Sequence, residues 1–104
     1  MKRIYISGRI KGYDGFLEHF AREQEVVEGL GYEVVNPCEL GEMGFTYEQY
    51  MKVDLQELLT CDAIYMLDGW ENSSGARIEF VVATVCGMPV YYEMSNPLNF
   101  PSKS

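Results

Sequence analysis

Segments with the pattern of β-strands alternate with segments with the pattern of α-helices along the 104 residues of this chain. The predicted strands are residues 2–7, 32–35, 62–67 and 88–92, and the predicted helices are residues 14–30, 47–59 and 75–86. Helical connections of this length favour parallel neighbouring strands joined by right-handed crossovers. We therefore expect an α/β fold, a three-layer α/β/α sandwich of about four parallel strands and three helices.

Local signals place the ends of these helices. Asp14 is the expected N-cap of the first helix, and Thr46 that of the second. Gly31 and Gly87 are typical of residues that follow the last helical turn. Apolar side chains predict the buried face of the first helix (Phe16, Phe20, Val27, Leu30), of the second (Tyr47, Tyr50, Met51, Leu55, Leu58) and of the third (Ile78, Val81, Val82, Val85).

The polar loops of the chain follow the predicted strands. In a small parallel sheet of the Rossmann or flavodoxin type, ligands bind beyond the carboxyl ends of the strands. Residues 8–13, 36–46 and 68–74 all belong to this edge of the sheet. We expect the functional site to lie between these three loops.

Composition restricts the function classes. The net charge of −8, from 16 acidic and 8 basic residues, argues against non-specific binding of nucleic acid or of a membrane surface. The first residues do not have the pattern of a signal peptide, and no apolar run is long enough to span a membrane. Cys38, Cys61 and Cys86 form no metal-binding pattern, so we expect reduced thiols, no metal, no cofactor and a cytoplasmic location.

The short chain also bears on assembly. A single domain of this size hides only part of its surface from water. We therefore expect a homo-oligomer, either a dimer or a larger assembly.

Two carboxylates occur where a purely structural role is not obvious. Asp54 falls near the centre of the apolar stripe of the second helix, where a carboxylate must be hydrogen-bonded, paired or used. Glu79 lies on the flank of the third helix, beside small residues that leave space around it. The alternatives are an Asp54 that binds a neighbouring backbone group or Arg, and a Glu79 that is an ordinary acidic residue near a helix start.

Two loops carry groups suited to an anionic ligand. The first has cations and glycines in the order Gly8, Arg9, Ile10, Lys11 and Gly12. The second has polar donors at a helix N-terminus, namely Ser73, Ser74 and Gly75, although simple capping also explains its serines. The two loops and the two carboxylates belong to the same edge of the sheet. Two carboxylates in unlike environments are what cleavage of a glycosidic bond requires.

Three motifs in this order resemble the nucleoside 2-deoxyribosyltransferase superfamily. Tyr5-Ile6-Ser7-Gly8 is similar to its first-strand motif. Asp54-Leu55, Leu58 and Cys61-Asp62-Ala63 resemble its D-L-x-x-L-x-x-[AC]-D segment. Ser74-Gly75-Ala76-Arg77-Ile78-Glu79 resembles its S-x-G-x-x-x-E turn into a helix. The SGxIxG and GWExSxGAxxE sequences are similar in particular to a compact branch found in phages and bacteria.

The resemblance implies roles for individual residues. Glu79 would be the nucleophile on the anomeric carbon, Asp54 would assist the proton and orient the sugar, and Tyr5 would hold the nucleophile. As in the related 2′-deoxynucleoside 5′-monophosphate N-glycosidases, a 5′-phosphate would bind at the remaining positions (Gly8, Arg9, Ile10, Lys11, Ser73, Ser74, Gly75). The domain would span residues 1–92, followed by an irregular tail, 93–104. In relatives, the C-terminal region of a neighbouring subunit helps to complete the pocket.

The first hypothesis is thus an enzyme that cleaves the N-glycosidic bond of a nucleoside or nucleoside 5′-monophosphate, either a glycosidase or a deoxyribosyltransferase. Related folds also bind nucleotides without turning them over, so a nucleotide-binding or sensing module is a second hypothesis. The third is an interaction domain of phage origin. The base, the sugar, the need for a phosphate and the choice between hydrolysis and transfer stay open at this point.

Overall fold

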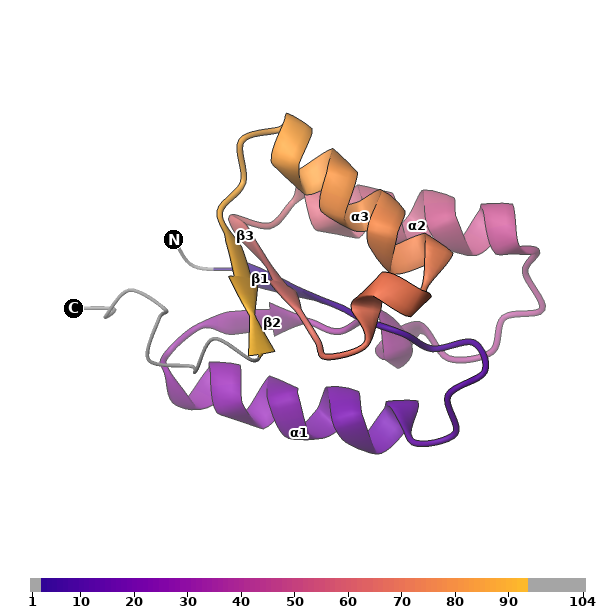
Figure 1. Ribbon diagram of the computed structural model, residues 1–104, viewed down its shortest axis with the longest axis horizontal. Coiled ribbons are helices and arrows are strands. Elements are labelled where there is room, and N and C mark those ends of the chain that lie inside the picture. Colours follow the sequence, from indigo (N-terminus) through magenta and orange to yellow (C-terminus); the bar gives the residue numbers. More distant parts are fainter. Residues whose placement is uncertain (1–2, 94–104) are drawn as a thin grey trace.

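The computed structural model of the chain describes residues 3–93 (Figure 1). Its elements follow in the order β1 (Arg3–Ser7), α1 (Phe16–Gly29), β2 (Glu33–Val35), η1 (Pro37–Leu40), α2 (Tyr47–Leu59), β3 (Ala63–Met66), η2 (Trp70–Asn72), α3 (Ser74–Val85) and β4 (Val90–Tyr92). The predicted α-helices and strands are all present, with ends that differ by up to two residues. The predicted loops contain the short 3₁₀ helices η1 and η2, and residues 94–104 of the predicted tail lie outside the described residues.

The four strands form one parallel sheet in the order β2-β1-β3-β4. Figure 1 shows α1 on one face of this sheet and α2 and α3 on the other. The predicted three-layer α/β/α sandwich is therefore confirmed. Within the described residues, no helix is long and apolar enough to cross a membrane.

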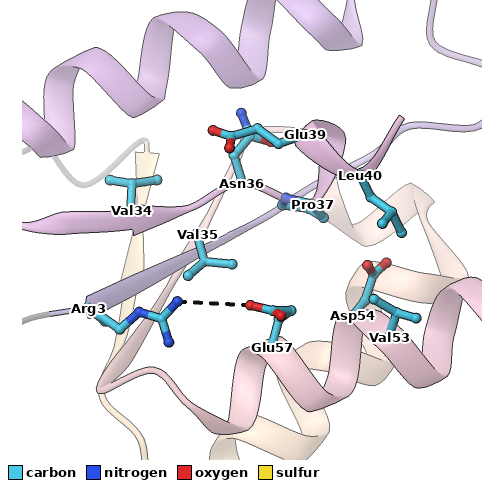
Figure 2. Close-up of a pocket in the computed structure, with 10 residues that line it drawn as sticks. All are labelled: Arg3, Val34, Val35, Asn36, Pro37, Glu39, Leu40, Val53, Asp54 and Glu57. Carbon is cyan, nitrogen blue, oxygen red and sulfur yellow. Dashed lines mark ion pairs between the residues drawn. The ribbon is translucent and has the colours of Figure 1, made fainter. Parts of the chain in front are cut away.

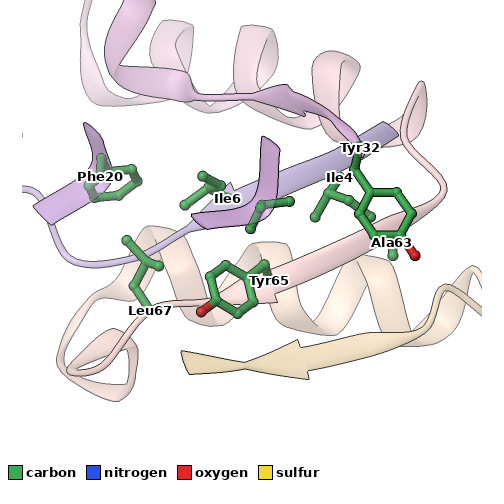
Figure 3. Packing of buried hydrophobic residues seen from close by; sticks show 8 residues of the cluster. Ile4, Ile6, Phe20, Tyr32, Ala63, Tyr65 and Leu67 are labelled. Carbon is green, nitrogen blue, oxygen red and sulfur yellow. The ribbon is translucent and has the colours of Figure 1, made fainter. Parts of the chain in front are cut away.

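Two hydrophobic clusters fill the spaces on the two faces of the sheet. The first packs α1 against the sheet, and Figure 3 shows Phe20 of α1 close to Ile6 and Leu67. The second includes Tyr5, Ile64 and Met66, and lies under α2 and α3. Successive residues of β1 alternate between the two clusters because side chains of a strand point to opposite faces. The central strands β1 and β3 are thus buried on both sides, as is typical of parallel sheets.

The predicted ends of α2 are confirmed, and those of α1 only in part. Thr46 is the N-cap of α2 and forms a capping box with Gln49, in which each side chain bonds the other residue's backbone N–H. The prediction that Asp14 caps α1 is wrong. Gly15 occupies the N-cap position without a side-chain bond, because a turn at Tyr13 delays the start of α1 to Phe16.

The predicted buried face of α3 is wrong for three of its four residues, whereas the fourth, Val82, is half-buried and packs against the second cluster. Ile78, Val81 and Val85 are 41%, 56% and 80% exposed, and the buried residues of α3 are Ala76, Glu79 and Ala83. The helix lies with its small residues against the sheet. A Cβ atom at Gly75 would lie 3.3 Å from the Met51 sulfur, a tight contact between α3 and α2 that the glycine avoids.

The capping box of α2 gives a test of the fold. We expect Thr46→Ala to lower the free energy of unfolding by about 1 kcal/mol, because the substitution removes the acceptor for the Gln49 N–H. Urea unfolding followed by circular dichroism measures this loss. Glu25→Gln, an exposed substitution in α1, is the control and should change stability by less than about 0.5 kcal/mol. Equal stability of the two variants would contradict the contribution of the cap.

Candidate active site

Glu79 is a buried carboxylate whose two oxygens are both hydrogen-bonded to hydroxyls of β1. Its side chain comes from the second turn of α3 and the residue is 5% exposed. The Tyr5 hydroxyl donates to Oε2 at 2.7 Å, and the Ser7 hydroxyl donates to Oε1 at 2.6 Å. A buried carboxylate is tolerated when its oxygens are satisfied in this way. The predicted association of Tyr5 with Glu79 is therefore present in the structure.

The surroundings of Glu79 bring the pKa of its carboxyl group close to neutral pH. The pKa of Glu79 is raised from 4.5 to about 7: burial makes the largest contribution and the charge of Asp54 adds to it, whereas the hydrogen bonds from Ser7 and Tyr5 oppose the shift. The pKa of Tyr5 is raised well above 10, first by burial and then by the charge of Glu79. Tyr5 therefore keeps its proton and remains a hydrogen-bond donor while Glu79 gains or loses its own.

Ser7 was not among the residues predicted for the site. It is completely buried and bonds Glu79 as closely as Tyr5 does. The sequence did contain a signal for it: Tyr5 and Ser7 are two residues apart on one strand, so their side chains share a face of the sheet. A polar residue at that position, next to a tyrosine predicted to hold the nucleophile, belongs to the same site.

Asp54 lies near Glu79 but in a more open environment. It is half-buried on α2, and its charge raises the pKa values of both Glu79 and Tyr5. The pKa of Asp54 is raised from 3.8 to about 6, first by burial and then by the negative charge of Glu57. The two predicted carboxylates are thus close enough to interact, and both have pKa values near those needed for proton transfer at neutral pH.

A cavity of about 320 Å³ opens beside Asp54 (Figure 2). It extends between α2 on one side and β2 with η1 on the other, and its lining includes Asn36, Leu40 and Val53. Figure 2 shows the Asp54 carboxylate directed from α2 toward the η1 side of this cavity. At its opposite end, Arg3 forms an ion pair of 3.9 Å with Glu57.

The cavity differs from the crevice expected from the sequence. It is lined by one of the three predicted loops, residues 36–46, and not by residues 8–13 or 68–74. Glu79 and Tyr5 are not part of its lining either, and both residues are buried. Asp54 is the one predicted site residue that faces this space.

Gly8 allows neighbouring side chains to pack closely against the backbone and leaves no space for a ligand at this position. It is buried with β1, and a Cβ atom at this position would lie 3.0 Å from Leu67 Cβ and 3.2 Å from the Phe20 ring. The next residues of the loop reach the surface: Arg9 is partly exposed, and Ile10 and Lys11 are exposed. The Arg9 guanidinium lies 3.4 Å from the Lys11 carbonyl oxygen, to which it donates.

The residues of the second predicted binding loop cap the start of α3 and contact α2. Ser73 is the N-cap of α3, and its hydroxyl accepts from the Ala76 N–H, as the capping alternative expected. The Ser74 hydroxyl lies 3.2 Å from the Tyr47 hydroxyl of α2. Gly75 packs against Met51 and Tyr47. These residues lie one turn before Glu79 on α3, so they are neighbours of the carboxylate along the helix.

His19 and Glu93 form a polar contact that the sequence did not indicate. Their side chains are 2.7 Å apart and mostly buried, although Glu93 was assigned to the irregular tail. Within residues 3–93, no group of three or more His, Cys, Asp or Glu side chains is arranged to hold a metal ion. The three cysteines are free, with Cys61 buried, Cys38 half-buried and Cys86 exposed.

Comparisons with known proteins agree with the fold. The structure is similar to that of the 2-deoxyribosyltransferase of Bacillus psychrosaccharolyticus, with a TM-score of 0.69 and 24% sequence identity over 86% of this chain and 70% of that chain. The predicted resemblance to this superfamily is therefore confirmed for the fold. No curated protein matches the sequence. Residues 2–92 match the family described as Domain of unknown function (DUF4406), and the chain belongs to this family.

Proposed function

We propose that this protein cleaves the N-glycosidic bond of a nucleoside or nucleoside 5′-monophosphate, with Glu79 as the nucleophile. The observation that carries the proposal is the buried Glu79 carboxylate. Tyr5 and Ser7 each donate a hydrogen bond to one of its oxygens, and its pKa is about 7. A carboxylate oriented in this way, with a second carboxylate nearby, suits a covalent glycosyl-enzyme mechanism. The fold shared with a 2-deoxyribosyltransferase supports the same class of reaction.

In the proposed first step, ionised Glu79 attacks C1′ of the sugar. A bond forms between the carboxylate oxygen and C1′, and the bond from C1′ to the base nitrogen breaks with its electron pair moving to the base. Asp54 in its acid form gives its proton to the base, which leaves as the neutral molecule. The cavity beside Asp54 offers space for that base.

The second step releases the sugar. Ionised Asp54 takes a proton from a water molecule, whose oxygen attacks C1′ and displaces Glu79. A second base in place of water gives transfer instead of hydrolysis. For a phosphorylated substrate, we place the phosphate at the surface loop with Arg9, Ile10 and Lys11, near the polar start of α3 at Ser73, Ser74 and Gly75.

The first test is release of free base, followed by chromatography, from a panel of nucleosides and their 5′-monophosphates. We expect Glu79→Gln to reduce release by at least about 10³-fold, because an amide of the same shape cannot attack C1′. Glu25→Gln, an exposed carboxylate on the opposite layer, is the matched control and should retain full activity. Mass spectrometry of rapidly quenched protein should detect the sugar on the wild type and not on Glu79→Gln.

Undiminished release of base by Glu79→Gln would overturn the mechanism. Intact nucleotide bound without release would support the sensing module, and no binding would leave the interaction domain.

The pH dependence of base release tests the roles of the two carboxylates. Ionised Glu79 and protonated Asp54 are both required, and their pKa values are about 7 and about 6. We expect kcat/KM to rise with pH as Glu79 ionises, to be highest between these two values, and to fall as Asp54 loses its proton. Asp54→Asn should lower kcat/KM about 10²-fold and remove the fall on the alkaline side. An alkaline fall that persists in Asp54→Asn would exclude Asp54 as the acid.

We also propose that α3 packs against a second copy of this chain. Ile78, Val81 and Val85 project from the side of α3 opposite its buried residues, at the i, i+3 and i+7 spacing of a helix-packing seam. Among the exposed residues of α3, the one charged side chain is Arg77. In a chain with a net charge of −8, two copies meet with least repulsion at a surface without carboxylates.

Light scattering coupled to size-exclusion chromatography tests this assembly. We expect a dimer or larger species for the wild type and a shift to monomer in Val81→Glu, because a buried charge in the seam is costly. Ala21→Glu adds the same charge on exposed α1, in the opposite layer, and should leave the assembly unchanged. A wild-type protein that is monomeric at about 100 µM would contradict the proposal.

A further inference from the structure

A chain of polar contacts begins at His19 of α1, and Figure 1 shows this helix on the face of the sheet opposite α3, the helix that carries Glu79. The Tyr13 hydroxyl is 3.1 Å from Nδ1 of His19. Nε2 of His19 is 2.7 Å from Oε1 of Glu93, and the same oxygen accepts the backbone N–H of Asp68 at 2.9 Å. The side chains of His19 and Glu93 are 7% and 18% exposed, so these contacts are largely shielded from water.

These contacts join segments that are distant in the sequence. Tyr13 ends the loop of residues 8–13, His19 lies at the end of the first turn of α1, and Glu93 follows β4. Asp68 begins the segment that leads from β3 through η2 to the start of α3. One carboxylate, that of Glu93, therefore connects both of the loops that we assign to phosphate binding.

The contact between Tyr13 and His19 is maintained for either charge state of the imidazole. Glu93 accepts from the Nε2–H of the ring. Nδ1 then accepts from the Tyr13 hydroxyl when the ring is neutral and donates to it when the ring is charged. The two rings also pack edge to face, with centroids 5.8 Å apart. A Cβ atom at Gly15 would lie 3.3 Å from the Tyr13 ring, a tight contact that the glycine avoids.

We propose that His19 is a positioning residue that fixes the loop of residues 8–13 through Tyr13, ready to receive the 5′-phosphate of a nucleotide. The inference rests on the proposed function for its substrate, but the restraint itself concerns the free protein. Arg9 and Lys11 are both positively charged and at least partly exposed, and ordering a loop that holds two cations costs conformational entropy and repulsion. If the loop is already ordered in the free protein, the substrate does not have to order it on binding. The affinity for the group that the loop contacts is therefore higher.

Three substitutions separate the contacts. Tyr13→Phe removes one hydroxyl and keeps the ring. The amide of Asn at position 19 occupies the place of Nδ1 and can still bond Tyr13, whereas the amide of Gln occupies the place of Nε2 and can bond only Glu93. We expect hydrogen exchange of the amides of residues 8–13 to become roughly five-fold faster in Tyr13→Phe and His19→Gln, and less so in His19→Asn. Exchange in the middle of α1 should not change.

Kinetics with two substrates identifies the purpose of the restraint. In Tyr13→Phe we expect KM for the nucleoside 5′-monophosphate to rise roughly five-fold, with unchanged kcat and unchanged KM for the nucleoside that lacks the phosphate. Loop exchange that stays at the wild-type rate in Tyr13→Phe and His19→Gln would overturn the inference. An equal rise in KM for both substrates would also overturn it, since the loop would then not serve the phosphate.

Failure of the proposed function is distinguished by the wild-type protein. If wild-type protein releases no base, the enzymatic proposal fails, whereas hydrogen exchange still decides whether His19 restrains the loop. Calorimetry with a nucleoside 5′-monophosphate then replaces the kinetic comparison. A roughly five-fold weaker Kd in Tyr13→Phe would support the positioning role, and an unchanged Kd would overturn it.

Discussion

The arrangement of this protein depends on the burial of one carboxylate, that of Glu79, over the central strand of the sheet. A buried carboxylate must find hydrogen-bond donors, and the hydroxyls of Tyr5 and Ser7 on β1 supply them. α3 can deliver Glu79 to these hydroxyls only if the rest of the same helical face is small, and Ala76 and Ala83 meet this condition. Ile78, Val81 and Val85 are consequently turned outward, where they form the seam that we assign to a second copy of the chain, whereas Phe80 and Val82 pack against the second cluster. One polar requirement thus sets the rotation of the helix, the composition of its inner face and the character of its outer face.

The two carboxylates of the candidate site differ in their environment, and this difference suits each to a distinct role in the mechanism that we propose. Glu79 is enclosed, and burial outweighs its two hydrogen bonds in setting its pKa. Asp54 is half-buried and faces a cavity, where it can contact both a ligand and water. A nucleophile has to be oriented and protected from water, whereas a group that exchanges protons needs access to the leaving group and to solvent. The separation of an enclosed carboxylate from an accessible one therefore agrees with the division of labour that we propose.

The edge of the sheet that carries the site is held from both faces. On the α3 face, the Glu79 contacts connect α3 to β1, and on the α1 face, the contacts of His19 and Glu93 connect α1, β4 and the loops after β1 and β3. The loop after β1 contains exposed and charged residues, whereas the loop after β3 also packs Trp70 against Phe80 of α3. Their position is therefore determined by polar bonds to the framework together with this aromatic contact, which is the usual way in which a rigid scaffold presents functional loops.

The sequence by itself determined the order and type of the elements, the parallel sheet and the capping of α2 by Thr46, because these features depend on local patterns. The resemblance of its motifs to the superfamily implied the pairing of Tyr5 with Glu79. The sequence also identified Asp54 as a carboxylate in an unusual position. Tertiary structure alone decided which side of α3 is buried, since the hydrophobic pattern favoured the apolar side and could not include the bonds from β1. It likewise decided that Gly8 is required by the side chains of Leu67 and Phe20 and that His19 meets Glu93 across 74 residues of sequence. Such contacts form between segments that only the folded sheet brings together, and no local periodicity records them.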